Sequence, residues 1–250
     1  ALHPWMDEGF TSWASADIMN HLRKEGLIGG DVAENPYART YAGLRNFRTS
    51  GKQEALSTHA DHYATNAAYG VAAYTNGSVY QEQLRYIVGE DVHQRIMLRY
   101  FNDWAFKHPN PNDFIRIAEK ESGLELDWYN EYWVNSVNYA DYAVKEVESG
   151  KGKSTDITLE KIGRMPMPLE VLVTMKNGDE RWFYIAPQIM RGVKAQPSYA
   201  KSWNILKDWG WAYPTYTFTI EVPKDDVKSV MINPTGRMFE DDVKNNEWKY

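Results

Sequence analysis

The sequence predicts an α+β protein in which a helical domain precedes a β-rich domain. Apolar residues recur every three or four positions through the first part of the 250-residue chain, which is the period of one helix face. From about residue 150 they alternate instead, as they do in half-buried strands. Within this second part, Asn177-Gly178 separates two apolar runs, and this dipeptide strongly favours a two-residue hairpin turn. We therefore expect a helical domain over residues 1–148 and an antiparallel, sandwich-like β domain over residues 149–250.

Five helices are expected in the first domain, and glycine and proline mark several of their ends. Gly89 separates two apolar periods and is a natural helix terminator. Another helical period begins at Pro111 and is followed by Gly123. Proline is common at the first position of a helix, and glycine is common just past its end. The expected helices cover Asp7–Leu22, Gly77–Val88, Glu90–Lys107, Pro111–Ser122 and Leu126–Val134.

The expected strands of the second domain follow a short polar stretch. SGKGKST, residues 149–155, is small, polar and basic, and we interpret it as the linker between the domains. The runs after it either alternate or are rich in β-branched and aromatic residues. These expected strands cover residues 157–162, 169–175, 181–186, 215–222 and 227–233.

The charge distribution argues against a nucleic-acid partner. Residues 1–142 hold 12 Lys and Arg against 19 Asp and Glu, a net charge of −7, and residues 143–250 hold 16 against 15, a net charge of +1. The two values add to the overall net charge of −6. Nucleic-acid-binding proteins neutralise phosphates with a basic face, and neither part of this chain has the excess of positive charge that such a face needs.

Composition excludes further classes of site. Cysteine is absent, so the chain has no disulfide, no thiolate zinc site and no cysteine nucleophile. The apolar runs fall short of the ~18 residues that a membrane-spanning helix needs, so no transmembrane segment is expected. With 43% apolar and 14% aromatic residues, the chain has enough apolar surface to form a packed core.

The segment WMDEGFT, residues 5–11, sets two carboxylates beside a glycine near the start of the first expected helix. Asp7 and Glu8 could favour the helix start alone, because negative charge is stabilised there. The segment also resembles W-[LM]-N-E-G-F-A of the aminopeptidase N and leukotriene hydrolase-like zinc metallopeptidases, the gluzincins. In that family the glutamate of this segment is the third zinc ligand and follows an HExxH motif by about eighteen residues. Here Asp7 stands in place of the family's asparagine.

A second segment, Tyr74-Thr75-Asn76-Gly77, resembles the Y-E-K-G motif that carries the catalytic tyrosine of the same family. Tyr74 lies 66 residues after Glu8, a spacing similar to that in the leukotriene hydrolase branch, although Asn76 replaces the family's lysine. The helices that follow occur in the family's order. The resemblance covers roughly residues 1–142 and implies the helical C-terminal half of a thermolysin-like catalytic domain.

The resemblance implies a role for four residues. Glu8 would be the third ligand of a zinc ion that activates water for peptide-bond hydrolysis, and Tyr74 would donate a hydrogen bond to the developing oxyanion. Asp7 and Tyr69 would line the substrate site. The implied cofactor is Zn2+, the implied substrate is a peptide, and the implied activity is that of an aminopeptidase.

The two histidine ligands that would complete such a site are not recognisable in this chain. It has six histidines, and none begins an HExxH motif. A single carboxylate cannot hold a catalytic zinc ion, which takes three protein ligands. We therefore expect the motif to lie upstream of Ala1, which makes this chain the C-terminal part of a longer peptidase. By itself, the chain is expected to bind no zinc and to be inactive.

Other interpretations stay open at this point. The chain could be a non-catalytic binding or scaffold module derived from such a peptidase, in which Glu8 only caps a helix and Tyr74 is an ordinary half-buried tyrosine. The segment His59–His62, with an aspartate between its histidines, could bind a metal, although such a pair is more often structural. The aromatic segment Trp209–Tyr213 could bind a glycan, although such clusters more often pack in a core.

The end of the chain suggests a location. Ile232-Asn233-Pro234 followed by Asn245-Asn246 resembles the tail of bacterial relatives that act outside the cytoplasm. Better-known aminopeptidases end instead in a large helical domain. The resemblance therefore implies an extracytoplasmic protein, which is periplasmic, secreted or attached to the cell surface.

Overall fold

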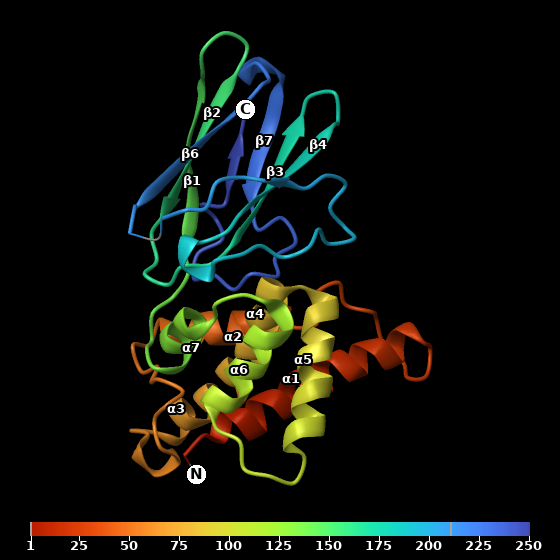
Figure 1. Cartoon of the computed structure of the whole chain (residues 1–250), viewed down its shortest axis with the longest axis vertical. Coiled ribbons are helices and arrows are strands. Elements are labelled where there is room, and N and C mark those ends of the chain that lie inside the picture. The colour runs from red at the N-terminus through yellow and green to blue at the C-terminus, as the bar shows by residue number, and fades with distance from the viewer. Residues whose placement is uncertain (1, 211) are drawn as a thin grey trace. The chain divides into compact units, whose positions relative to one another are not determined.

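The computed structural model describes residues 2–210 and 212–250. It has two compact units, Ala1–Val137 and Asn138–Tyr250. The first unit is helical and the second contains two β-sheets (Figure 1). The predicted α+β fold class, a helical part followed by a β part, is confirmed. The boundary between the units lies earlier than the predicted position between residues 148 and 149.

The described residues of the helical unit form seven α-helices, a π-helix and a short 3-10 helix. α4 (Gly77–Val88) and α6 (Pro111–Ser122) have the predicted bounds, and the other three predicted helices differ only at their ends. The remaining elements are α1 (Pro4–Lys24), α2 (Ala38–Arg48), the 3-10 helix η1 (Ala60–His62), α3 (Asn66–Gly70), the π-helix η2 (Val71–Asn76), α5 (Glu90–Trp104) and α7 (Asp127–Val134).

The sequence did not predict α2 or α3. In α2 only Tyr41 and Leu44 are buried, so its apolar stripe is too narrow to stand out. α3 has five residues, and its start is capped by Thr65, whose side chain accepts a hydrogen bond from the backbone N–H of Ala68 at 3.1 Å. Short or mostly exposed helices leave little periodicity for a sequence pattern to detect.

α4 is the central helix of this unit, and all twelve of its residues are buried. It packs against both α1 and α5. The ring of Tyr80 in α4 lies 4.8 Å from that of Trp5 in α1 and 4.9 Å from that of Tyr129 in α7, measured between centroids. Aromatic rings bury large apolar areas and favour such tilted or edge-to-face contacts. The start of α1 is thereby packed against the centre of the unit.

Local signals set the ends of the helices. Asn110 and Asp113 form a capping box at the start of α6, in which each side chain accepts a hydrogen bond from the other residue's backbone N–H. Gly123 ends α6 in the left-handed conformation, and Gly89, at a φ of +88°, ends α4. Both glycines terminate helices as predicted.

The described residues of the β unit form a three-stranded and a five-stranded sheet (Figure 1). The first has the order β1-β2-β6 and is antiparallel throughout. The second has the order β5-β4-β3-β7-β8, and only its β4–β5 pair is parallel. The strands are β1 (Tyr142–Ser149), β2 (Thr155–Lys161), β3 (Leu169–Met175), β4 (Glu180–Ile185), β5 (Asn204–Ile205), β6 (Thr215–Ile220), β7 (Val227–Ile232) and β8 (Glu247–Lys249).

The two sheets share an apolar core. Val171 and Val173 of β3 are fully buried, as are Val230 and Ile232 of the neighbouring strand β7. Phe183 of β4 and Phe218 of β6 belong to different sheets, and their ring centroids are 5.2 Å apart. Side chains from the inner faces of both sheets thus meet, as in a β-sandwich.

The predicted hairpin joins β3 and β4, but its loop is longer than the predicted two residues. The backbone N–H of Met175 donates to the carbonyl of Asp179 at 2.8 Å, which leaves Lys176, Asn177 and Gly178 as the loop. Gly178 has a φ of +93°, a backbone conformation that glycine adopts at no steric cost. Thr174 pairs with Glu180 next to the turn, and the ladder continues to Leu169 and Ile185.

The predicted linker is wrong. Its end residues Ser149 and Thr155 pair with each other as the last residue of β1 and the first of β2, and residues 150–154 form the turn between these strands. β1 was not predicted because a bulge between Val144 and Glu146 shifts its register and interrupts the two-residue alternation that marks a strand. The β unit therefore begins earlier, at Asn138.

α1 is long, with 21 residues, but it carries several charged side chains along its length. Among the residues that the structure describes, no helix combines the length and the apolar character that crossing a bilayer requires.

Candidate active site

The structure brings Glu8 and Tyr74 together, although 66 residues separate them. Glu8 is half-buried in α1, and Tyr74 lies on the π-helix η2 with 43% of its surface exposed. The Tyr74 hydroxyl donates a hydrogen bond to the Glu8 carboxylate, and this bond is the largest effect that raises the pKa of Tyr74, ahead of desolvation and the charge of Glu8. The hydroxyl therefore keeps its proton at neutral pH and remains a hydrogen-bond donor.

The other two predicted site residues lie beside this pair. After the Glu8 hydrogen bond and desolvation, Tyr69 and Asp7 also raise the pKa of Tyr74 through electrostatic interactions, which weaken quickly with distance at a solvated surface. Asp7 is exposed on α1. Tyr69 is half-buried on α3, where its ring packs edge-on against Tyr63 at 5.6 Å. The structure thus gathers all four residues into one cluster, which we call the candidate site: Asp7, Glu8, Tyr69 and Tyr74.

Two glycines explain how the two segments come so close. Gly9 follows Glu8, and Gly77 ends the tyrosine motif. Their backbones touch: a Cβ atom on Gly9 would lie 2.5 Å from the Cα atom of Gly77, and one on Gly77 would lie 2.9 Å from the Cα atom of Gly9. Packed backbones cannot accommodate a side chain at such distances, so both positions require glycine. The glycine of each motif therefore sets the separation of Glu8 and Tyr74.

Tyr74 is presented by a π-helical segment, a rare conformation that occurs often at functional sites. Asn76, at the end of this segment, is buried, and its side-chain oxygen accepts a hydrogen bond from the indole N–H of Trp133 in α7 at 3.1 Å. The residue that departs from the family's lysine thus anchors η2 to α7. Six residues carry too little periodicity to distinguish a π-helix from an α-helix, so the sequence does not reveal it.

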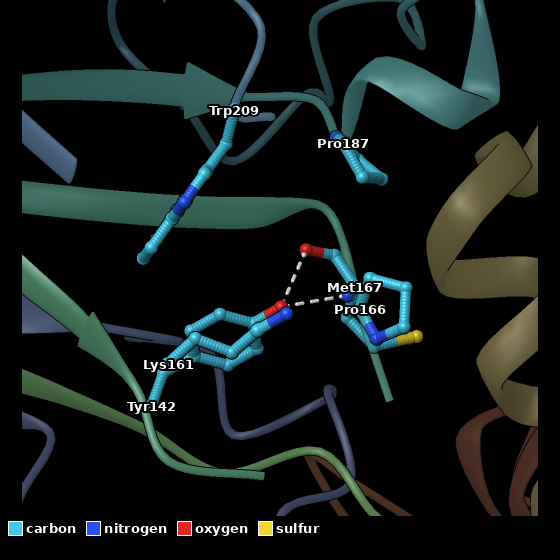
Figure 2. A pocket seen from close by; sticks show the side chains of 6 residues that line it. All are labelled: Tyr142, Lys161, Pro166, Met167, Pro187 and Trp209. Carbon is cyan, nitrogen blue, oxygen red and sulfur yellow. Dashed lines mark hydrogen bonds between the residues drawn. The ribbon is translucent and has the colours of Figure 1, made fainter. Parts of the chain in front are cut away.

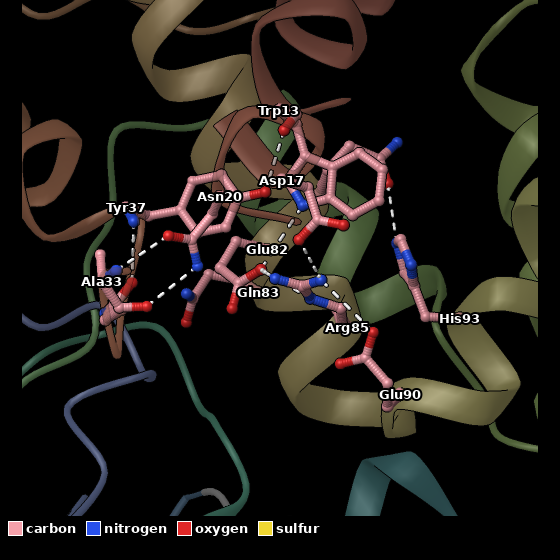
Figure 3. A network of polar contacts seen from close by, with 12 residues as sticks. Trp13, Asp17, Asn20, Ala33, Tyr37, Glu82, Gln83, Arg85, Glu90 and His93 are labelled. Atoms are coloured by element: carbon pink, nitrogen blue, oxygen red, sulfur yellow. Dashed lines mark hydrogen bonds and ion pairs between the residues drawn. The ribbon is translucent and has the colours of Figure 1, made fainter. Parts of the chain in front are cut away.

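A buried polar network holds α1 on α4 (Figure 3). Arg85 of α4 donates hydrogen bonds to Glu82 at 2.8 Å and to Asp17 of α1 at 2.8 Å. The guanidinium group of Arg85 also lies 5.3 Å from the ring centroid of Trp13, whose indole N–H donates to Glu82 at 3.4 Å. Glu82 is fully buried, so its charge needs these partners. The network fixes the helix that carries Glu8 against the helix that follows Tyr74.

Sequence reasoning missed Glu82 and Arg85, although a signal was present. The two opposite charges lie three residues apart in a predicted helix that ends in the apolar run Tyr86–Val88. Side chains at this spacing are neighbours on a helix surface, and charged residues in a buried helix are almost always paired. The pair could therefore have indicated a buried ion pair beside the tyrosine motif.

The segment His59–His62 has a structural role. The rings of His59 and His62 are 5.1 Å apart, but Nδ1 of His59 accepts a hydrogen bond from the backbone N–H of Asp61 at 3.2 Å and caps the short helix η1. Within residues 2–210 and 212–250, no group of three or more His, Cys, Asp or Glu side chains is placed to hold a metal ion. The structural interpretation of this segment is therefore the supported one.

The described residues fit a zinc ion only in part. Glu8 offers one carboxylate ligand beside the Tyr74 hydroxyl. A catalytic zinc site takes three protein ligands, and the described part of the chain brings no such group together. No catalytic step is therefore assigned to a metal held by this chain alone.

In the β unit, a small pocket is lined mainly by aromatic and proline side chains (Figure 2). The hydroxyl of Tyr142 accepts a hydrogen bond from the Met167 N–H at 2.8 Å and donates one to the Met167 carbonyl at 3.3 Å. Trp209 is buried, with its ring 5.7 Å from that of Tyr142, and its N–H donates to the Tyr213 carbonyl at 3.0 Å. Trp209 is thus a core residue rather than a platform for a sugar ring, and Trp211 lies outside the described residues.

Comparison with known proteins identifies the family. A profile of the peptidase family M1 domain matches residues 2–133, more than half of the chain. The chain belongs to peptidase family M1. The matched region contains both motifs, so the resemblance inferred from Glu8 and Tyr74 is confirmed at the level of the family. No curated protein matches this M1 sequence.

A solved structure extends the likeness to the β unit. The structure of aminopeptidase A of Legionella pneumophila, in complex with aspartic acid, is similar to this M1 chain with a TM-score of 0.58. The similarity covers 94% of the residues of the M1 chain described here. The sequence identity is 11%, so the likeness shows the fold alone. The chain spans 23% of the length of the Legionella protein.

Proposed function

We propose that this chain supplies the third zinc ligand, Glu8, and the oxyanion-stabilising hydroxyl, Tyr74, of a zinc-dependent aminopeptidase. The observation that carries the proposal is the hydrogen bond between these two side chains. It joins two motifs that sequence resemblance assigns to the same reaction centre, and it does so through a glycine contact that belongs to both motifs. Helix capping would account for Glu8 alone but not for its pairing with Tyr74.

The rest of the site is proposed to come from a longer polypeptide. The described residues contain no group of three ligands for a metal ion, and the chain corresponds to 23% of an aminopeptidase of similar fold. We infer that two histidine ligands and the general base lie in a preceding segment. Without them, the chain has no activity of its own.

Each residue of the candidate site has a chemical task in this proposal. A zinc ion in such a site lowers the pKa of bound water and polarises the scissile carbonyl. Tyr74 keeps its proton and donates to the oxygen on which negative charge develops. Glu8 contributes a negative charge at the metal position. Asp7 and Tyr69, which flank the pair, contact the peptide substrate.

The test uses the product of the complete gene, assayed with aminoacyl-p-nitroanilides and analysed for zinc. Tyr74→Phe should lower kcat about 100-fold or more with zinc retained, because an oxyanion donor contributes about 3 kcal/mol to the barrier. Glu8→Ala should lose zinc. Tyr213→Phe, at another exposed tyrosine, and Glu25→Gln, at the far end of α1, are matched controls that should change neither quantity.

Two outcomes would contradict the proposal. Wild-type turnover in Tyr74→Phe would remove this hydroxyl from the reaction, and stoichiometric zinc in Glu8→Ala would remove Glu8 from the ligand set. A full-length product that binds no zinc and cleaves no peptide would instead make this chain part of a non-catalytic binding or scaffold module.

A location outside the cytoplasm is proposed from the tail, whose Ile232–Pro234 segment and following asparagine pair resemble those of bacterial extracytoplasmic relatives. Cell fractionation tests it. The full-length protein should appear in the periplasmic, surface or secreted fraction, and its confinement to the cytoplasm would contradict the proposal.

A further inference from the structure

β6 is an edge strand of the three-stranded sheet. Exposed edges invite pairing with another chain, and proteins usually protect them with short strands, charges or bulges. The other edge strands of the described β unit have such protection. β5 has two residues and β8 has three, and β1 contains a bulge and the charged side chains of Lys145, Glu146 and Glu148.

β6 has none of these features. Its six residues, Thr215–Ile220, include no charged side chain and no proline. It pairs with β2 without a register shift, and no other strand of the described residues pairs with it. Its inner face is held in the core by the ring contact of Phe218 with Phe183. The edge is therefore straight, firmly positioned and unprotected.

The hydrogen-bond pattern shows which backbone groups point outward. The backbone N–H of Lys161 donates to the carbonyl of Pro214 at 2.8 Å, which makes these two residues a hydrogen-bonded pair of the β2–β6 ladder. Hydrogen-bonded and non-hydrogen-bonded pairs alternate along an antiparallel ladder. The residues that direct their N–H and C=O groups away from β2 are therefore Thr215, Thr217 and Thr219. No backbone partner for these groups lies in the described part of the chain.

We propose that β6 pairs antiparallel with β6 of a second copy of this chain, around a two-fold axis at Thr217. In this register Thr217 faces its counterpart and Thr215 faces Thr219, so every outward N–H and C=O group of these threonines gains a partner. Two-fold symmetry requires a self-complementary surface. The regular placement of threonine at every second position provides it.

The side chains match in the same register. On the outer face, threonine meets threonine, a favourable cross-strand pair that the chain already uses between Thr158 of β2 and Thr217, whose Oγ1 atoms are 2.8 Å apart. On the inner face, Tyr216 meets Phe218, which is a favourable aromatic pair. A shift by one residue would place threonines against the apolar face, so the alternation of the strand excludes that register.

The absence of charge in β6 favours a second copy over a partner recognised by charge, because self-pairing of a charged strand would set like charges opposite each other. A single strand pair buries less than the area of a standard-size interface. The association is therefore weak and depends on concentration. This pairing does not require the proposed peptidase activity.

Sedimentation velocity of the complete gene product that contains these 250 residues tests the proposal, over about 1 µM to about 1 mM, a range that covers weak interfaces. The wild type should shift from monomer to dimer as concentration rises. Thr217→Lys and Thr217→Glu should each remain monomeric, because like charges would meet on the two-fold axis. An equimolar mixture of the two variants should dimerise again, because opposite charges would then meet.

The mixing experiment separates loss of pairing from loss of folding. Position 217 is exposed, so both variants should keep the circular dichroism spectrum of the wild type. Thr49→Lys, at an exposed threonine of the helical unit, is the control and should dimerise as the wild type does. A wild type that stays monomeric throughout, charged variants that dimerise alone, or a mixture no more associated than its components would overturn the proposal.

Discussion

The helical unit and the β unit differ in how closely their geometry is tied to single residues. In the helical unit, Gly9 and Gly77 allow two backbones to touch, and the side chains next to this contact are Glu8 and Tyr74. The β unit is held by an apolar sandwich core, and such a core accepts many combinations of apolar residues. This difference explains why short motifs identify the family from the helical unit, whereas the β unit shows its relationship only through its fold.

The two units also bury carboxylates in different surroundings. Glu82 of the helical unit accepts a hydrogen bond from the guanidinium group of Arg85 at 2.8 Å and forms an ion pair with it. Glu240 of the β unit accepts hydrogen bonds from the amide side chain of Asn246 at 2.7 Å, from that of Asn233 at 3.1 Å, and from a backbone N–H. Removal of Arg85 should therefore lower the free energy of unfolding strongly, whereas the contribution of Glu240 to this free energy should depend on pH.

The largest effect is expected for Arg85→Ala, which leaves Glu82 buried without its cation. Breaking a buried ion pair from one side costs about 3–5 kcal/mol. Urea denaturation followed by circular dichroism at the helix minimum measures the loss. Arg99→Ala is the control, because Arg99 pairs with Glu121 at 2.9 Å on the exposed side of α5 and should contribute little. Similar losses in both variants would contradict the role assigned to the buried network.

The second effect concerns Glu240, whose pKa is raised to about 7, chiefly by burial. Because its native pKa lies above the ordinary value of 4.5, the folded state holds this proton more tightly than the unfolded state does. The resulting stabilisation is complete below about pH 4.5 and is lost as pH rises through about 7, a difference of roughly 3 kcal/mol.

Glu240→Gln should therefore flatten the decline of the unfolding free energy between pH 4.5 and 7. Urea denaturation at several pH values gives this slope. Glu146→Gln, an exposed change in the same unit, should leave the slope as it is in the wild type. An unchanged slope in Glu240→Gln would show that another group accounts for the pH dependence.

A smaller effect is expected for Gly9→Ala, which forces a methyl group against Gly77. Overpacking of this kind typically costs about 1–3 kcal/mol. Gly43→Ala makes the same change in α2, where no atom lies within 4 Å of the new methyl group. It should stabilise the chain by about 0.5–1 kcal/mol, because alanine favours helices. Urea denaturation measures both changes in the free energy of unfolding. A loss in Gly9→Ala with a gain in Gly43→Ala supports the glycine contact, and equal changes would count against it.

The smallest effect is expected at the start of α6. Asn110→Ala removes the capping box with Asp113 and should cost about 1 kcal/mol. Asn112→Ala, two residues further into the same helix, removes an exposed side chain and should cost nothing measurable. Urea denaturation gives the free energy of unfolding of both variants. A loss in Asn112→Ala as large as that in Asn110→Ala would exclude the cap as the cause.

The sequence predicts an element well where its local signals agree. Gly89 and Gly123 place the ends of α4 and α6, and Asn177-Gly178 places the β3–β4 hairpin. β1 could not be predicted, because its bulge breaks the alternation and its charged residues resemble those of a loop. In both cases the local sequence pattern, rather than the fold as a whole, determined whether the element could be predicted.

The candidate site was partly visible in the sequence. The two motifs predicted Asp7, Glu8 and Tyr74, and the segment before the second motif predicted Tyr69. The structure brings the four together. The network around Arg85 depends on contacts between residues far apart in the chain, which periodicity does not report.

The most direct test of the account is the sequence of the gene upstream of the Ala1 codon. If this chain supplies Glu8 and Tyr74 to a zinc peptidase, an HExxH motif should be encoded about eighteen residues before Glu8, in frame with it. A start codon or an unrelated sequence at that position would contradict the account and leave Glu8 as a helix-start residue in a non-catalytic module.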